Sequence, residues 1–249
     1  MENPSYIALS QQMALRRQMD VIATNIANAS TPGFKAERIM FAELVAGKAP
    51  YPFSGTIGTR PGLSFVSEMG MLRDTTDGGM TQTGNTLDLA ISGPGYFAVE
   101  TPAGTRYTRQ GAFRLDQDGR IVTVDGYPLL DAQDRPISIR PGETRIEIST
   151  KGAVTTESGE VGRIQIAQFE DEQAMRKIGA GLYETDQDPV PGEIAAEIRQ
   201  GMLEGSNVKA VTEVTSMMEI LRRYQSAQKI IDSEHELERR AIEKLSRMT

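Results

Sequence analysis

The chain has 249 residues, with 27 Lys and Arg against 34 Asp and Glu, one His, and no Cys or Trp. The absence of thiols excludes disulfide frameworks, cysteine nucleophiles and zinc fingers, and a lone His leaves no pair for a metal site and no orienting partner for most hydrolase triads. The net charge of -7 and pI near 5.0 argue against a dedicated nucleic-acid binder, and no window reaches the roughly 18 apolar residues of a membrane span.

Residues 1–35 carry the pattern of an N-terminal helix. Asn3 followed by Pro4 is typical of a helix start. A heptad stripe follows, in which spacings of four and three alternate: Ala8, Gln12, Leu15, Met19, Ile22, Ile26 and Ala29. The helix is predicted to run to about Ala29 and to stop at Pro32-Gly33. Its only basic pair, Arg16 and Arg17, lies inside this stretch, so we expect no cleaved secretory signal.

Glycine and proline concentrate in the middle of the chain. Residues 39–204 hold 22 of the 24 Gly and 10 of the 12 Pro, which favours turns and strands. Residues 36–80 are weakly patterned and are predicted to be an extended connector. Residues 81–183 are predicted to form an all-β domain, with one hairpin from 96–99 and 106–108 and another from 113–115 and 120–124. Residues 184–204 are predicted to be a return connector.

Residues 205–249 are predicted to form a C-terminal helix capped by Ser206 or Asn207. Its stripe again alternates spacings of three and four, beginning Val214, Met217, Leu221, Tyr224, Gln228 and Ile231. The expected fold is therefore α+β: terminal α-helices paired as a coiled coil, flanking an extended connector and an all-β middle domain.

The terminal helices are too poor in apolar surface to be stable alone. Burying the five or so larger apolar side chains of the first stripe contributes about 10 kcal/mol, whereas ordering some 25 residues costs roughly 1–2 kcal/mol each. Pairing the two helices still leaves Met13, Val21, Val211 and Met218 facing outward. We hypothesise that neighbouring subunits cover this surface; the alternative is a monomeric helical hairpin.

The charge distribution supports assembly through the ends. Residues 1–38 carry 4 basic and 3 acidic side chains and residues 205–249 carry 8 and 7, whereas the middle carries 15 and 24. Many copies of a nearly neutral segment can pack around one axis without strong repulsion, while the acidic middle stays in solvent.

No motif assembles into an active site. Asp116 and Asp118 resemble the opening of a calcium loop, but Tyr127 stands where the bidentate Glu should be, so an Asp-Gly turn is favoured. Ser226 and Lys229 match a nucleophile spacing on a heptad helix, which is expected by chance. His235 is expected to be a packed or solvent-edge imidazole.

Four blocks of the sequence, in order along nearly the whole chain, resemble the bacterial flagellar rod and hook proteins. The N-terminal block comprises Ala8-Leu9-Ser10, residues 19–28 and Thr31-Pro32-Gly33-Phe34-Lys35. The others are residues 84–97, residues 101–128 with Tyr107-Thr108-Arg109, and residues 200–208. Length and the short connector are most similar to the proximal-rod members, with a distal-rod member as the alternative.

The resemblance implies a structural, non-enzymatic subunit of the axial drive shaft that transmits torque for motility. It implies an inner helical tube around the export channel with the β domain outside. The implied partners are copies of the chain, other rod proteins and the flagellar type III export apparatus. The implied location is the rod across the periplasm, reached without signal cleavage. We expect no cofactor, metal or nucleic acid, and no membrane insertion.

The residues predicted to form the assembly interface share the two helical stripes, with three asparagines added as amide or capping contacts. They are Leu15, Met19, Ile22, Asn25, Ile26, Asn28, Asn207, Val214, Met217, Leu221, Tyr224 and Ile231. Two other hypotheses remain open: a secreted β-domain adhesin dimerised by its helices, and a calcium-dependent hydrolase using Asp116 and Asp118. We also expect proteolysis near residues 35 and 205 to leave a resistant middle fragment.

Overall fold

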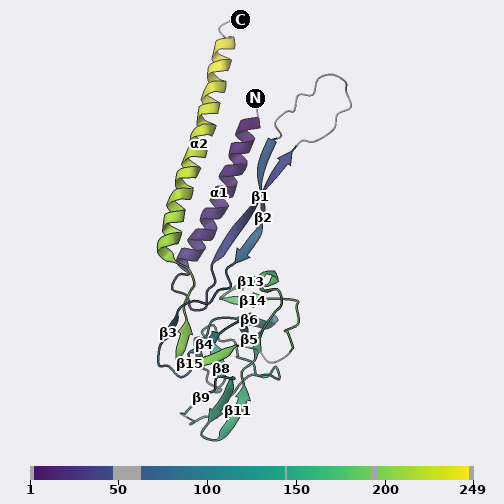
Figure 1. Cartoon of the computed structure of the whole chain (residues 1–249), viewed down its shortest axis with the longest axis vertical. Helices are drawn as coiled ribbons and strands as arrows, with labels where there is room; N and C mark the ends of the chain where they lie inside the picture. Colours follow the sequence, from purple (N-terminus) through teal and green to yellow (C-terminus); the bar gives the residue numbers. More distant parts are fainter. Residues whose placement is uncertain (1–2, 47–62, 144, 192–195, 247–249) are drawn as a thin grey trace, which may run out of the picture. The chain divides into compact units, whose positions relative to one another are not determined.

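The structure, a computed structural model, describes residues 3–46, 63–143, 145–191 and 196–246. It divides into two compact units. Of the described residues, the helical unit comprises 3–27, 37–46, 63–72 and 209–246, and the β unit comprises 28–36, 73–143, 145–191 and 196–208. Two terminal helices and a β-rich middle confirm the α+β class (Figure 1).

The helical unit contains α1 (Asn3–Ala27) and α2 (Ala210–Ser246). α1 begins at the predicted Asn3 and ends two residues before Ala29. The helices pack against each other along α1, and Gln12 Nε2 donates to Gln228 Oε1 at 2.5 Å. Among the described helices, none combines the length and apolarity required to cross a membrane.

The predicted connector at 36–80 contains two strands. β1 (Glu37–Ala46) and β2 (Leu63–Arg73) form a two-stranded sheet in the helical unit (Figure 1). The strands lack the period-two alternation on which the prediction depended: β1 has the continuous apolar run Ile39-Met40-Phe41, and Gly70 interrupts β2. The extended-connector prediction was therefore wrong for these residues; residues 47–62 lie outside the described part.

The β unit contains both predicted hairpins. β5 (Tyr96–Thr101) pairs with β6 (Gly104–Thr108), and β7 (Phe113–Leu115) pairs with β8 (Ile121–Thr123). β5 and β6 lie in a five-stranded sheet with β12 (Ile166–Ala167), β14 (Leu182–Glu184) and β13 (Arg176–Gly179), in the order β12-β5-β6-β14-β13. A second sheet joins β11 (Gly159–Arg163), β10 (Ala153–Thr156) and β9 (Glu147–Ile148).

The predicted return connector at 184–204 also contains strands. β15 (Glu197–Gln200) pairs antiparallel with β4 (Leu89–Ser92), and β16 (Met202–Glu204) pairs with β3 (Met80–Gln82). These partners are about a hundred residues apart in the sequence, so no local hairpin signal could indicate them. The prediction was wrong because such short strands are defined by distant partners.

The core of the β unit consists of two apolar clusters, one on each face of β5. Phe97 and Val99 lie in the larger cluster, together with Ile121, Leu129 and Ile198. Tyr96 points to the smaller cluster, which also holds Ala167, Phe169, Met175 and Tyr183. β5 is therefore buried on both faces, and β15 contributes Ile198 to the same core as the predicted domain.

Candidate assembly surface

The two helices meet along an apolar seam. Leu15 and Ile22 of α1 and Ile220 of α2 are buried in one cluster. Four half-buried side chains pack against it: Met19, Ile26, Met217 and Tyr224. The structure thus brings together six of the twelve predicted interface residues, and these six pack within the chain. Ile231 lies half-buried further along α2.

The inward side of α2 differs from the predicted stripe at alternate positions. Ile220 and Ala227 are buried, whereas the predicted Leu221 is 45% exposed and Val214 is 44% exposed. The predicted and the observed stripe share Met217, Tyr224 and Ile231. Between these shared positions, the predicted stripe uses Leu221 and Gln228, whereas the observed stripe uses the residue before each of them. The small Ala227 was the available signal, since it permits closer helix approach than Gln228.

The predicted residues Val214 and Leu221 instead belong to an apolar strip that does not face α1. This outer strip consists of Val211, Val214, Met218 and Leu221, all exposed, at spacings of three, four and three. Val211 is the most exposed, at 83%. On α1, Met13 is also exposed. The outward placement expected for Met13, Val211 and Met218 is therefore confirmed.

Val21, also expected to face outward, lines a groove in the helical unit. The groove has a volume of about 390 Å³ and is bordered by Val21 and Ile22 of α1, Ile39 of β1, and polar side chains near the start of α2. Val21 is half-buried there.

The side-chain amide of Asn25 both donates and accepts a hydrogen bond inside the helical unit. Its Nδ2 donates to the Glu37 carbonyl at 2.8 Å, and its Oδ1 accepts from the Glu37 N–H at 3.1 Å. Asn25 is only 1% exposed. Its amide forms the two hydrogen bonds that the backbone of a neighbouring strand would form with Glu37, and it thereby fixes the first residue of β1 against α1.

Asn207 and Asn28 also form intrachain bonds. Asn207 Oδ1 accepts from the Ala36 N–H at 2.7 Å, and its Nδ2 donates to the carbonyls of Asp74 and Thr76. Because α2 begins three residues later, Asn207 does not cap it as predicted. Asn28 Oδ1 accepts from Thr31 Oγ1 at 3.1 Å, which closes the turn after α1.

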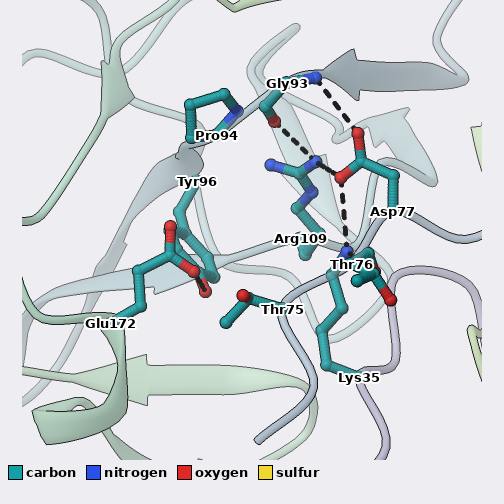
Figure 2. A pocket seen from close by; sticks show the side chains of 9 residues that line it. All are labelled: Lys35, Thr75, Thr76, Asp77, Gly93, Pro94, Tyr96, Arg109 and Glu172. Carbon is teal, nitrogen blue, oxygen red and sulfur yellow. Dashed lines mark hydrogen bonds and ion pairs between the residues drawn. The ribbon is translucent and has the colours of Figure 1, made fainter.

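A cavity of about 280 Å³ in the β unit has two buried cations in its wall (Figure 2). Arg109 Nη2 donates to Asp77 Oδ1 and to the Gly93 carbonyl, both at 2.8 Å, and Lys35 Nζ donates to the Thr76 carbonyl at 2.8 Å. Because these donors are bonded within the chain, the cavity does not form an anion site.

Across the same cavity, Tyr96 donates its hydroxyl to Glu172 at 3.0 Å (Figure 2). Burial, with the nearby Glu172 carboxylate, raises the pKa of Tyr96. The phenol therefore stays neutral and serves as a structural donor.

The acidic pair considered for calcium forms a turn. Asp116 Oδ1 accepts from the backbone N–H groups of Asp118 and Arg120, and Asp116 Oδ2 accepts from Arg120 Nε at 2.8 Å. Desolvation raises the pKa of Asp116, but the bonds from Arg120 and Asp118 outweigh it and lower the pKa overall. The Asp-Gly turn is thus observed; Ser226 and His235 lie exposed on α2.

Comparisons with known proteins give consistent matches along the chain. Residues 6–35 match the family model "Flagella basal body rod protein", residues 90–156 match "Flagellar hook protein FlgE/F/G D1 domain", and residues 199–244 match "Flagellar basal body rod FlgEFG protein C-terminal". The flagellar basal-body rod protein FlgF of Caulobacter vibrioides is 40% identical over 249 residues, covering all of both chains.

Two further relatives have lower identity to the chain. The protein named FlgF from Rhizobium meliloti is 33% identical, with 98% of each chain covered. The protein named FlgG from Bacillus subtilis is 35% identical, with 93% of this chain and 95% of the relative covered. FlgG-type relatives are thus the weaker alternative to the full-length FlgF match.

Proposed function

Because this chain belongs to the flagellar basal-body rod protein family and is a structural subunit of the rod, we propose that it polymerises through the outer strip of its paired terminal helices. The partners are copies of the chain and other rod proteins. The proposed place is the proximal rod, in agreement with the FlgF relatives.

The observation that carries the proposal is the outer strip of α2. Four apolar side chains at heptad spacing remain exposed after the α1–α2 seam has formed. Exposed large apolar side chains arranged in a continuous stripe mark interaction sites more often than scattered ones do. Full burial of such side chains contributes roughly 1.5–3 kcal/mol each, so the half-exposed strip offers several kcal/mol for each neighbour contact.

The pairing of α1 and α2 as a coiled coil is part of this proposal. It is supported by the alternating spacings of the inward residues Met217, Ile220, Tyr224, Ala227 and Ile231. A second seam on the same helix, formed by the outer strip, allows a subunit to contact a neighbour through a heterologous interface. Heterologous interfaces whose rotation does not close into a ring generate helical shafts.

The predicted interface residues have two roles in the proposal. Val214 and Leu221 contact neighbours directly. The seam residues Leu15, Met19, Ile22, Ile26, Met217, Tyr224 and Ile231 hold the helix pair together, and Asn25, Asn28 and Asn207 fix the chain around it. We further propose export by the flagellar type III apparatus without signal cleavage, and a position in the rod across the periplasm.

The test compares Leu221→Asp with Ser226→Asp in cells whose only copy of the gene carries the change. Both sites are exposed on α2 and lie about 140° apart around the helix. An unpaired carboxylate buried in an apolar contact costs several kcal/mol, so Leu221→Asp should reduce the subunit in purified basal bodies by about 100-fold and abolish motility. Ser226→Asp should leave both unchanged.

The same purified variants should remain monomeric and helical, because the outer strip lies outside the α1–α2 seam. Normal incorporation of Leu221→Asp would contradict the proposal. A discrete wild-type dimer in sedimentation, lost in Leu221→Asp, would instead favour the adhesin hypothesis.

A further inference from the structure

The groove that Val21 lines is the second exposed feature of the helical unit, beside the outer strip. It has a volume of about 390 Å³ and lies where α1, β1 and the first turns of α2 meet. Its walls are Gln18, Val21 and Ile22 of α1, residues 37–39 of β1, and Thr212, Glu213 and Ser216 of α2. We name this surface the helical groove. All of its residues lie in one compact unit, so its shape is a property of the helical unit alone.

The helical groove is apolar at depth and polar at its edge. Ile22 is buried and Val21 and Ile39 are half-buried, whereas Arg38 and Thr212 are exposed. Protein interfaces have the same anatomy, with an apolar centre inside a polar rim. The arrangement therefore suits apolar side chains that enter from outside the unit.

The helical groove and the outer strip lie on opposite flanks of α2. Angles around the helix are measured here from the inward direction midway between Ile220 and Tyr224. At 100° per residue, Ser216 in the groove lies about 60° to one side, and Val214 in the strip lies about 100° to the other. Thr212 and Met218 lie further round on the same two sides. One α2 thus presents the strip on one flank and borders the groove on the other.

The two surfaces also match in length. The outer strip runs from residue 211 to residue 221, about 15 Å along the helix. α1 and α2 run antiparallel, and Gln12 bonds to Gln228 (Figure 1). Val21, nine residues after Gln12, therefore lies level with about residue 219 of α2. The helical groove thus borders nearly the same turns of α2 as the strip.

The charges of the two surfaces are complementary. In the helical groove, Glu37 and Glu213 outweigh Arg38. Beside the outer strip, the exposed Arg222 follows Met218 by one turn and lies about 40° from it around α2. Arg222 and Glu213 are nine residues apart, about 13 Å, so they meet between neighbours that are displaced along their axes, as in a helical shaft. Opposite charges favour this pairing of surfaces.

We infer that the outer strip of one copy of the chain packs into the helical groove of the next copy, with Arg222 of the first beside Glu213 of the second. The inference rests on the proposed function and adds to it the surface that receives the strip. Because the two surfaces are different, the contact is heterologous, and each copy offers its own strip to a third.

The absence of cysteine allows a direct test, because each variant then has a single thiol. Cells make two versions of the chain in place of the wild type, one with Val21→Cys and a size tag, the other with Met218→Cys. Purified basal bodies are treated with a short bis-maleimide. Linked dimers should contain one tagged and one untagged chain, and dimers of two like chains should be about tenfold rarer.

Matched cysteine variants control for chance linkage. Ser226 is exposed on α2, about 80° from Met218 and about 12 Å further along the helix. With Ser226→Cys in place of Met218→Cys, mixed dimers should fall about tenfold. Val214→Cys lies within the outer strip and should give mixed dimers as Met218→Cys does. It is the decisive variant if Met218→Cys is not incorporated.

Charge exchange tests the polar part of the contact. Glu213→Arg and Arg222→Glu should each lower the amount of the subunit in basal bodies by about tenfold, and the double variant should restore it to within about twofold. Glu219→Arg makes the same change of charge as Glu213→Arg at an exposed site about 120° away around α2. It should leave incorporation unchanged.

Three results would overturn the inference. Dimers of two Met218→Cys chains would show that strip packs on strip. An absence of mixed dimers would show that the groove receives something else, such as a different rod protein. A double charge variant no better than the single ones would remove the ion pair. In all three cases Leu221→Asp still blocks incorporation, so the proposed function stands, whereas normal incorporation of Leu221→Asp contradicts both.

Discussion

At the scale of single residues, the polar side chains of the sequence blocks act inside the chain. Asn25 pairs in both directions with the Glu37 peptide, and Asn207 bridges three segments. The sequence indicated that these amides matter, but not their partners, because Asn207 and Ala36 are 171 residues apart. An amide whose partner is local, such as Asn28 with Thr31, could be predicted as part of a turn.

Asp131 gives a pH-dependent prediction at the same scale. Its carboxylate is nearly buried and accepts from the backbone N–H groups of Gln133 and Arg135 at 2.8 and 2.9 Å. Burial raises the pKa of Asp131, but these bonds and the Arg135 guanidinium outweigh it and hold the pKa below its ordinary value. The charged form is therefore favoured by folding.

Asp131→Asn should lower the free energy of unfolding of the β unit by about 2 kcal/mol at pH 7. Because the folded-state pKa is the lower one, the stabilisation is complete above the unfolded-state pKa and is lost as pH falls through the folded-state pKa. The difference between wild type and variant in urea unfolding should therefore disappear in acid. A constant difference from pH 7 to pH 2 would contradict this assignment.

At the scale of secondary-structure elements, the sequence predicted the strand pairs whose two strands are close together in the chain. The hairpins β5–β6 and β7–β8 have short turns and were predicted with nearly their observed bounds. The pairs β15–β4 and β16–β3 join distant segments and were missed. For α2, periodicity predicted the helix and three of its five inward residues, Met217, Tyr224 and Ile231, because the predicted and the observed stripe share these positions.

The register of α2 yields a prediction on stability. Ile220→Ala removes buried atoms from the α1–α2 seam and should destabilise the helical unit by about 2–4 kcal/mol. Leu221→Ala removes a half-exposed side chain of the outer strip and should cost the monomer less than about 1 kcal/mol. The free energy of unfolding of the two variants is measured by urea unfolding, followed by the circular dichroism of the helices. Equal losses of this free energy would contradict the observed register of α2.

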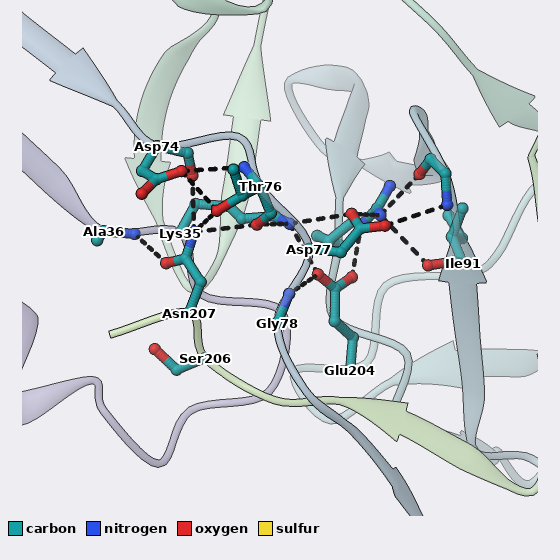
Figure 3. A network of polar contacts seen from close by, with 12 residues as sticks. Lys35, Ala36, Asp74, Thr76, Asp77, Gly78, Ile91, Glu204, Ser206 and Asn207 are labelled. Carbon is teal, nitrogen blue, oxygen red and sulfur yellow. Dashed lines mark hydrogen bonds and ion pairs between the residues drawn. The ribbon is translucent and has the colours of Figure 1, made fainter. Parts of the chain in front are cut away.

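At the scale of the whole molecule, the sequence blocks that resemble the rod family contribute to both units: residues 8–10 and 19–27 of the first block lie in α1, whereas its residues 31–35 and the three later blocks lie in the β unit. Gly33 and Lys35 come from the first block, Arg109 from the third and Glu204 from the fourth. Residues from three of the blocks thus form a buried ion cluster within the β unit (Figure 3). Because Lys35 is buried, cleavage near residue 35 requires local opening of the β unit, which revises the expected proteolysis.

The bounds of the β unit give the last prediction. The sequence placed the all-β domain at 81–183, but β15 supplies Ile198 to the core and pairs with β4, and β16 pairs with β3. A fragment of residues 81–183 therefore lacks β15, β16 and the first residue of β3, leaves an edge of β4 unpaired, and exposes the apolar surface that Ile198 covers. It should melt without a cooperative transition. A fragment of residues 73–208 retains these strands and loses only the segment 28–36 of the β unit, so it should melt cooperatively. The melting of both fragments is followed by the near-ultraviolet circular dichroism of their tyrosines. If both fragments melted alike, the strands after residue 184 would be dispensable, and the domain would end where the sequence alone placed it.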